Sequence, residues 1–243
     1  MKLLAYPITI VYFLFFGFTL GVFHPIQWVC LNLFGYNAHA KSVASLNWCL
    51  LRCLNILGTR FTFRNPHHIP TDKPLIIVTN HQTMYDIPPI IWYMRKHHPK
   101  FVSKKELGKG IPSISYNLRH GGSVLINRKD GVQALKEIEK LGKYIETHNR
   151  SAVIFPEGTR SRNGLPKPFK SHGLRMLMTH APSALIIPVS INNSWKLLRY
   201  GKFPMGLFNH LTFDVHKPIV NKGNQEDLIE KIEEIIKKGI RVA

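Results

Sequence analysis

Acidic residues are scarce in this chain. It has 14 Asp and Glu among 243 residues, against 33 Lys and Arg, so its formal net charge is +19 at pH 7. This excess of positive charge does not indicate any particular fold. It implies an anionic partner, such as nucleic acid, an anionic lipid surface or a phosphorylated substrate.

Cysteine is scarce as well. The three cysteines, Cys30, Cys49 and Cys53, contain no Cys-x-x-Cys pair. An odd number without that spacing argues against a disulfide framework and against a cysteine-based zinc site. The doubled histidines at 67–68 and 97–98 do not predict a metal site either, because neighbouring side chains diverge on a helix or a strand. We therefore expect a reduced, cytoplasm-facing protein without a metal.

Charged residues are absent from Leu3 to Ala40. The mostly apolar run Leu3–Phe23 matches the ~20 residues that cross the hydrocarbon core of a bilayer. It is interpreted as one spanning helix, or as a helical hairpin or interfacial anchor that turns near His24-Pro25. A secretory signal peptide is disfavoured, because the small residues at 38–40 lie far beyond the apolar core.

A second apolar stretch follows and carries Arg52, which suits a helix on the membrane surface or packed on the first helix. The basic body of the chain begins with Lys41, so the positive-inside tendency places this body in the cytoplasm, at the face of the inner membrane. We expect hydrophobic anchoring helices in residues 1–58 and an α/β domain in residues 59–243.

The remaining chain alternates short β-branched runs with helical patterns. Strands are expected near 59–64, 75–79, 101–103, 123–126, 152–155, 184–191 and 211–215, and helices near 90–98, 135–145, 173–180 and 228–235. This alternation predicts a mixed, mostly parallel β-sheet flanked by helices.

Three expected strands end in polar clusters. These are His81 with Asp86, Asn127 with Arg128, and Glu157-Gly158-Thr159-Arg160. Open α/β sheets hold their ligands outside the carboxyl ends of the strands, so we expect the clusters to converge.

His81 and Asp86 are a candidate catalytic pair. On a regular helix, positions five apart point about 140° from each other, but in a turn that begins a helix only at Asp86 the two side chains can meet. Asp86 would then accept the Nδ1–H of the imidazole and leave Nε2 free to take a proton from an alcohol. No Ser or Cys adjoins His81, so the alcohol would belong to the substrate. The alternative is that Asp86 only caps the helix before Pro88-Pro89 and that His81 is structural.

The third cluster suits a phosphate. Gly158 lets the backbone approach a ligand closely, and Arg160 offers planar, bidentate donors. Lys104 and Arg128 would add charge. The alternative is an exposed charged turn.

Four ordered blocks resemble the glycerolipid acyltransferase family, and most closely its bacterial lysophosphatidic acid acyltransferases. They are Asn80-His81-x-x-x-x-Asp86, Gly122 to Arg128, Phe155 to Arg160, and Ile187-Pro188-Val189. The resemblance spans roughly residues 59–191. One position departs from the family pattern, since Asn127 stands where the family usually has Asp.

The resemblance implies an acyl transfer to the 2-hydroxyl of lysophosphatidic acid from an acyl thioester, on coenzyme A or acyl carrier protein, with no further cofactor. It implies that His81 is the base and that Asp86 orients it. By the same resemblance, Arg160 holds the phosphate, with Glu157 and Gly158 shaping its loop and Thr159 in the same phosphate site. Lys104 and Arg128 are secondary phosphate ligands, and Asn80, Asn127 and Pro188 are supporting residues. Anionic membrane lipids are expected partners.

Three other functions stay open. The acceptor can be another lysolipid, such as a lyso-ornithine lipid or lysophosphatidylcholine. The protein can also be a non-catalytic, basic binding protein of the membrane surface. Nucleic-acid binding is a third and weaker alternative that the positive charge permits, and sequence-specific binding is not expected because no recognised binding motif is present.

Overall fold

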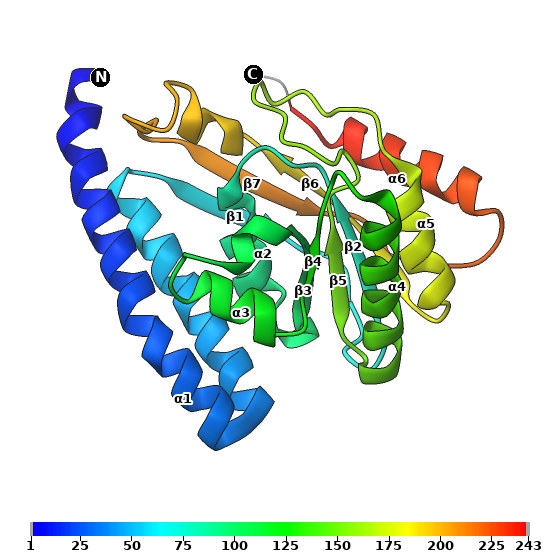
Figure 1. Cartoon of the computed structure of the whole chain (residues 1–243). Helices are drawn as coiled ribbons and strands as arrows, with labels where there is room; N and C mark the ends of the chain where they lie inside the picture. The colour runs from blue at the N-terminus through cyan, green and yellow to red at the C-terminus, as the bar shows by residue number, and fades with distance from the viewer. Residues whose placement is uncertain (1, 242–243) are drawn as a thin grey trace.

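The computed structural model describes residues 2–241. Within them an eight-stranded sheet lies between two layers of helices (Figure 1). The strands are β1 (Arg60–Arg64), β2 (Leu75–Thr79), β3 (Pro99–Lys104), β4 (Val124–Ile126), β5 (Ser151–Ile154), β6 (Leu185–Asn192), β7 (His210–Val215) and β8 (Ile219–Val220). Their order is β1-β7-β6-β2-β5-β3-β4, with β8 paired to β6. The strands β2 to β6 run parallel, and β6 pairs antiparallel with β7 and β8. The predicted mixed, mostly parallel sheet is confirmed.

Six α-helices complete the described chain. They are α1 (Lys2–Ile56), α2 (Ile87–Tyr93), α3 (Ile114–His120), α4 (Gly131–His148), α5 (Ser171–His180) and α6 (Gln225–Lys238). The helix predicted from residue 90 begins three residues earlier, because Pro88 and Pro89 fit its first turn, where a missing N–H leaves no hydrogen bond unmade. The sequence patterns did not reveal α3 and β8, which are both short.

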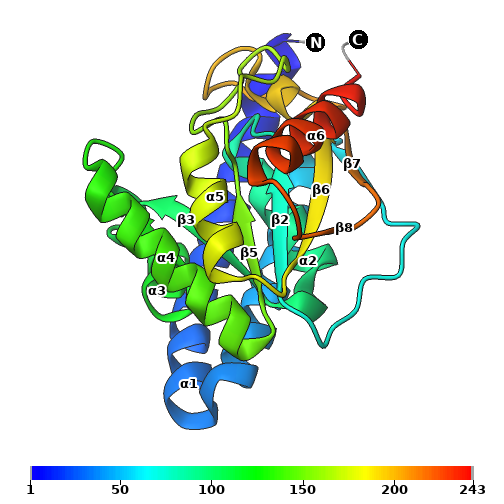
Figure 2. The same ribbon diagram turned by 90° about the vertical axis from the view of Figure 1, so that its right-hand side faces the viewer.

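The central strand β2 separates two hydrophobic cores. Leu75 and Ile77 belong to the core under α1 and α2, whereas Ile76 and Val78 belong to the core under α4, α5 and α6. Alternate side chains of a strand point to opposite faces, so a strand covered on both faces is apolar throughout. All five residues of β2 are buried, and Figure 2 shows the second helical layer in front of the sheet.

Pro188 lies inside β6 without interrupting it. The antiparallel partners of β6 are β8 at residues 185–186 and β7 at residues 189–192. Pro188 falls between these two partners, where its missing N–H costs no ladder hydrogen bond. Its carbonyl still accepts the N–H of His216 at 2.9 Å.

The element α1 is a pair of helices joined at Gly35, where φ is 75° and ψ is −169°. Only glycine adopts such a backbone readily. The alternative that placed a turn near His24-Pro25 was wrong about its position, because the first helix continues through Pro25 and the chain folds back ten residues later (Figure 1). Leu20 packs against Leu46 and Leu50, so the second helix packs on the first.

The first helix also packs on the sheet domain. Ala5 and Tyr12 belong to the same core as Leu54, Leu57 and Tyr85, and the N–H of Met205 donates to Thr9 Oγ1 at 3.0 Å. The division into residues 1–58 and 59–243 therefore stays a prediction, since one core contains side chains from both parts.

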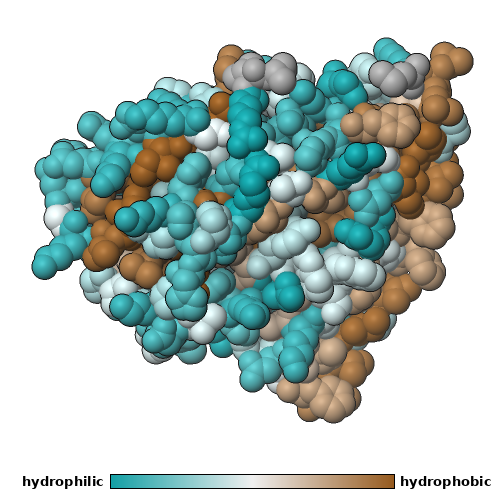
Figure 3. Space-filling model, turned by 180° about the vertical axis from the view of Figure 1, so that it is seen from behind, coloured by the Kyte–Doolittle hydropathy of each residue, from teal (hydrophilic) through white to brown (hydrophobic). Residues whose placement is uncertain are grey.

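The outward face of α1 is apolar. Exposed residues on it include Leu3, Leu14, Phe15, Phe18, Trp28, Leu33 and Phe34. They form a continuous hydrophobic band along one side of the molecule (Figure 3). By length and composition α1 is sufficient to cross a membrane, although core helices and signal sequences meet the same criterion.

Candidate active site

The site begins where β2 ends. The Asn80 side chain accepts the N–H of Ile191 at 2.7 Å and donates to its carbonyl at 2.9 Å. The pairing of β2 with β6 stops at Thr79, so this amide replaces one more step of the ladder. Asn80 thereby fixes the chain direction into the turn that carries His81.

His81 and Asp86 meet in this turn, as predicted. Residues Met84–Asp86 form a single 3-10 turn before α2, and His81 Nδ1 lies 2.8 Å from Asp86 Oδ2. The same oxygen accepts the backbone N–H groups of Gln82 at 2.7 Å and Thr83 at 3.0 Å. The Asp86 side chain therefore caps the preceding 3-10 turn, Met84–Asp86. The same side chain makes no capping hydrogen bond to α2.

Two hydroxyls complete the environment of Asp86, and sequence reasoning missed both. Ser194 Oγ donates to Asp86 Oδ1 and lies 2.6 Å from Thr83 Oγ1. Ser194 and Asp86 are both completely buried. Each oxygen of the Asp86 carboxylate nevertheless has a hydrogen-bond partner. A signal was present in the sequence, because the polar residues 193–194 directly follow β6 at the same edge as the three predicted clusters.

The imidazole of His81 is held from its other side. It stacks on Phe155 with ring centroids 4.1 Å apart. The His81 carbonyl accepts the N–H of Ser161 at 2.8 Å, and the residue is 8% exposed. Its Nε2 faces Arg160, whose Nε lies 3.4 Å away. The predicted convergence of residues 81 and 160 is thus present, and the ring edge reaches the surface.

Glu157 organises the loop that carries Arg160. One carboxylate oxygen accepts the N–H of His81 at 2.8 Å, and the other accepts the N–H of Lys167 at 3.0 Å. Burial raises the pKa of this carboxyl, and the two backbone donors oppose the shift. Glu157 was expected at the phosphate site as a residue that shapes the loop of Arg160, and both its oxygens are used in this way. Gly158 has φ of 67°, the left-handed conformation that the tight turn requires.

The other predicted ligands lie at the same edge. Burial and the charge of Arg160 lower the pKa of Arg128, so the positive charge of Arg160 acts on this guanidinium. Thr159 is exposed beside Arg160, and Lys104 is exposed at the end of β3. Asn127 shapes its turn by accepting the N–H of Lys129 at 3.1 Å. Within residues 2–241 no group of three or more His, Cys, Asp or Glu side chains is placed to hold a metal ion.

Fold and site define an open α/β protein that presents a histidine–aspartate pair beside two arginines at the carboxyl edge of its sheet. The sequence profile of the Acyltransferase family matches residues 60–192, which is more than half of the chain. The chain belongs to this acyltransferase family.

Several relatives of known name are similar to the chain. It is 27% identical over 132 residues to 1-acyl-sn-glycerol-3-phosphate acyltransferase alpha of Ovis aries, a match that covers 54% of this chain and 45% of the relative. It is 36% identical over 134 residues to 1-acyl-sn-glycerol-3-phosphate acyltransferase of Helicobacter pylori (strain J99), covering 51% of this chain and 54% of the relative. The chain thus spans about half the length of the curated relatives it matches.

A solved structure matches over almost the whole chain. The crystal structure of the 1-acyl-sn-glycerophosphate acyltransferase PlsC from Thermotoga maritima superimposes with a TM-score of 0.77 at 25% sequence identity. The match covers 98% of this chain and 94% of that protein, so it includes α1 as well as the sheet.

Proposed function

We propose that the protein transfers an acyl chain from a thioester to the 2-hydroxyl of 1-acyl-sn-glycerol-3-phosphate and produces phosphatidic acid. The names of the relatives support this acceptor. The observation that carries the proposal is the imidazole of His81, which is bound to Asp86 through Nδ1 at 2.8 Å and turns Nε2 toward a guanidinium.

His81 acts as the general base. A carboxylate only accepts hydrogen bonds, so Asp86 holds the proton on Nδ1 and leaves the lone pair on Nε2. The substrate hydroxyl donates its proton to Nε2 while its oxygen attacks the thioester carbonyl. The new C–O bond forms, the C–S bond breaks, and the proton passes from His81 to the departing thiolate. Asp86 stabilises the imidazolium that exists between these steps.

Arg160 binds the phosphate of the acceptor. Without substrate its guanidinium faces His81 Nε2, at a distance that is long for a hydrogen bond. A phosphate offers Arg160 shorter, charge-assisted bonds, and its movement to that phosphate leaves Nε2 to the hydroxyl. The charge of Arg160 also acts on Arg128, which is a second ligand of the phosphate, and Lys104 and Thr159 stand at the same edge.

The acyl donor is an acyl-coenzyme A or an acyl carrier protein thioester, and the reaction needs no further cofactor or metal. The thiolate leaves readily, so the chain supplies a base, a phosphate ligand and proximity between the two substrates. The tails of the acceptor and product stay in the bilayer, because the apolar band on α1 holds the site at the cytoplasmic surface of the inner membrane.

One assay separates this function from its alternatives. Purified protein in detergent micelles is given acyl-coenzyme A or acyl carrier protein thioester, with lysophosphatidate, a lyso-ornithine lipid, lysophosphatidylcholine or no acceptor. We expect thioester consumption that depends on lysophosphatidate and yields phosphatidic acid. Turnover with another lysolipid alone would reassign the acceptor. Binding of lipid without thioester consumption by any acceptor would show a non-catalytic membrane protein.

A further inference from the structure

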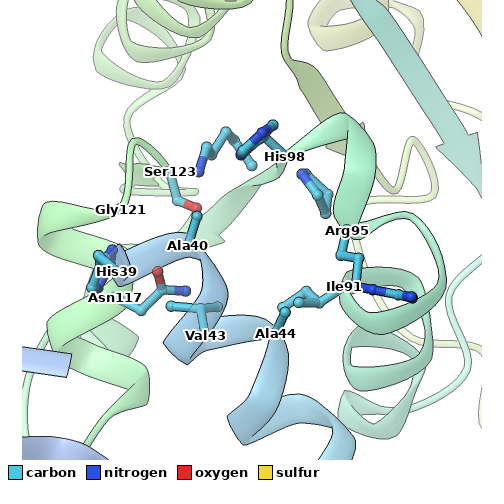
Figure 4. Close-up of a pocket in the computed structure, with 12 residues that line it drawn as sticks. His39, Ala40, Val43, Ala44, Ile91, Arg95, His98, Asn117, Gly121 and Ser123 are labelled. Atoms are coloured by element: carbon cyan, nitrogen blue, oxygen red, sulfur yellow. The ribbon is translucent and has the colours of Figure 1, made fainter. Parts of the chain in front are cut away.

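A second cationic site lies at the amino-terminal edge of the sheet, opposite His81. Lys100 is the second residue of β3 and pairs with Ala152 at the start of β5. Beside it is a cavity of about 30 Å³, enclosed by α1, the end of α2 and α3 (Figure 4). Its polar lining consists of His39, Arg95, His98, Lys100, Asn117 and Ser123.

Lys100 is buried without a carboxylate partner. It is 6% exposed, and no ion pair joins it to an acidic residue in the part of the chain that the structure describes. Its Nζ lies 4.9 Å from the centre of the Tyr36 ring, and the guanidinium of Arg150 lies 3.5 Å from the same ring. Burial and the charge of Arg150 lower the pKa of Lys100 to about 7. A buried cation next to a second cation is costly unless an anion compensates it.

Hydrogen-bonding groups are available around the cavity. His39 is 1% exposed, and its Nε2 has no partner among the described residues. Ser123 Oγ accepts the N–H of Phe101 at 3.1 Å, which leaves its hydroxyl hydrogen free to donate. Figure 4 shows the Asn117 amide and the Ser123 hydroxyl directed toward the cavity.

The remaining two polar groups at the cavity have partners. The guanidinium of Arg95 lies 4.2 Å from the Trp92 ring centre and donates to the Trp92 carbonyl at 2.8 Å. His98 Nδ1 lies 3.1 Å from the Tyr36 hydroxyl. These two groups are therefore already engaged, and the groups left for a ligand are Lys100, His39, Asn117 and Ser123.

We propose that this pocket binds a phosphate-type oxyanion, with Lys100 as the counter-charge and Asn117 and Ser123 as hydrogen-bond donors. Its volume admits a group of only a few atoms. Such a group is either free phosphate or the headgroup of an anionic phospholipid, because α1 forms one wall of the pocket and also carries the exposed apolar band. The site is distinct from the substrate site, because it lies at the other edge of the sheet from Arg160.

The test is thermal unfolding of the purified protein in uncharged detergent, with sodium phosphate or sodium chloride at equal ionic strength. Lys100→Met removes the charge and keeps the length of the side chain. Lys217→Met removes an exposed charge and is the matched control, and Arg160→Ala weakens the substrate site. The lysine variants are made in the Arg160→Ala background, because Arg160 is itself a proposed phosphate ligand. We expect phosphate to raise the Tm of Arg160→Ala alone and of Arg160→Ala with Lys217→Met, but not that of Arg160→Ala with Lys100→Met. A phosphate effect that persists in Arg160→Ala with Lys100→Met would overturn the proposal.

A second variant keeps the test decisive if Lys100→Met does not fold. Asn117→Asp preserves shape and places a carboxylate in the cavity beside Lys100. We expect a higher Tm in chloride than that of wild type, and at least a tenfold weaker phosphate affinity in calorimetric titration. Wild-type phosphate affinity in this variant would contradict the assignment.

The two sources of phosphate are separated in nanodiscs. One arm uses phosphatidylcholine discs with added free phosphate, and the other uses discs that contain phosphatidylglycerol in phosphate-free buffer. A Tm increase that requires Lys100 in the first arm identifies free phosphate, and one in the second arm identifies the lipid headgroup. Absence of a Lys100-dependent increase in both arms would refute the site.

Discussion

Replacement of Asp86 by Asn separates the charge of this side chain from its geometry. Oδ2 accepts three N–H groups, from His81 at 2.8 Å, Gln82 at 2.7 Å and Thr83 at 3.0 Å. In Asp86→Asn the amide oxygen keeps this position, because an NH₂ group there would face two fixed backbone donors. Ser194 can accept from the new NH₂ group in place of donating to Oδ1. The variant therefore retains the turn and the tautomer of His81, and loses the negative charge.

The size of the effect follows from Coulomb's law. Two unit charges about 4 Å apart interact by about 4 kcal/mol at an effective dielectric constant of about 20. This attraction exists only while His81 carries the substrate proton, so its loss raises the activation free energy. Since about 1.4 kcal/mol corresponds to a tenfold change in rate, we expect kcat to fall about 10³-fold.

The assay measures kcat with lysophosphatidate and acyl-coenzyme A by mass spectrometry of the product, and Tm by thermal unfolding. Loss of charge-assisted hydrogen bonds costs about 1–3 kcal/mol, and each kcal/mol lowers Tm by about 2–4 °C in a protein of this size. The variant should therefore be less stable but folded at the assay temperature. A lowered Tm with wild-type kcat would show that Asp86 serves only the backbone of the turn, and would refute the reasoning.

Three further changes test the surrounding groups. Arg160→Ala should raise the KM for lysophosphatidate at least about tenfold and leave the KM for the thioester nearly unchanged, because only the acceptor phosphate loses a charge-assisted partner. Glu157→Gln should lower Tm, since its NH₂ group must face the backbone N–H of either His81 or Lys167, at a cost of about 1–3 kcal/mol. Lys100→Met should be more stable than wild type in phosphate-free buffer at pH 7, and this advantage should shrink as the pH rises toward 10.5.

The sign of the last effect comes from proton linkage. Unfolded Lys100 keeps its proton up to an ordinary pKa of 10.5, whereas in the folded protein burial lowers the pKa to about 7. Between these values the unfolded state binds more protons, so wild-type stability rises with pH, and the Met variant lacks this contribution. The other titratable groups around Lys100 and its pocket are unchanged in both proteins: Tyr36, His39, Arg95, His98 and Arg150. A stability difference between wild type and Lys100→Met that is constant with pH would contradict this prediction. Equal changes of the two KM values in Arg160→Ala would contradict the phosphate role of Arg160. An unchanged Tm of Glu157→Gln would contradict the role of Glu157 in the loop.

The strands were predictable where local pattern and burial agree. The run 75–78 is apolar throughout because β2 is covered on both faces, and polar residues after strand ends marked the edge where the site forms. The turn of α1 was misplaced because Pro25 is a familiar helix breaker, whereas the chain turns where Gly35 adopts a positive φ. The sequence alone does not show whether the proline or the glycine ends the first helix, because the answer depends on what each helix packs against.

The residues of the site were predictable from the sequence, but the hydrogen-bond partners of their side chains were not. A motif places Glu157 beside Arg160 in sequence, yet only coordinates show that its carboxylate binds two backbone N–H groups. Ser194 is more than 100 residues from Asp86 in the chain and meets it through the β2–β6 pairing. The pairing of strands distant in sequence creates that contact, and single-sequence patterns do not contain it.

The central claim is that the imidazole of His81 takes the proton of the attacking hydroxyl, and His81→Ala tests it most directly. The measurement is kcat of the purified variant with lysophosphatidate and acyl-coenzyme A, beside His68→Ala as a control at an exposed histidine. Loss of a general base predicts that kcat falls by about 10²–10⁴ in His81→Ala, with unfolding and vesicle binding like those of the control. A folded, membrane-bound His81→Ala protein with kcat near that of wild type would contradict the account.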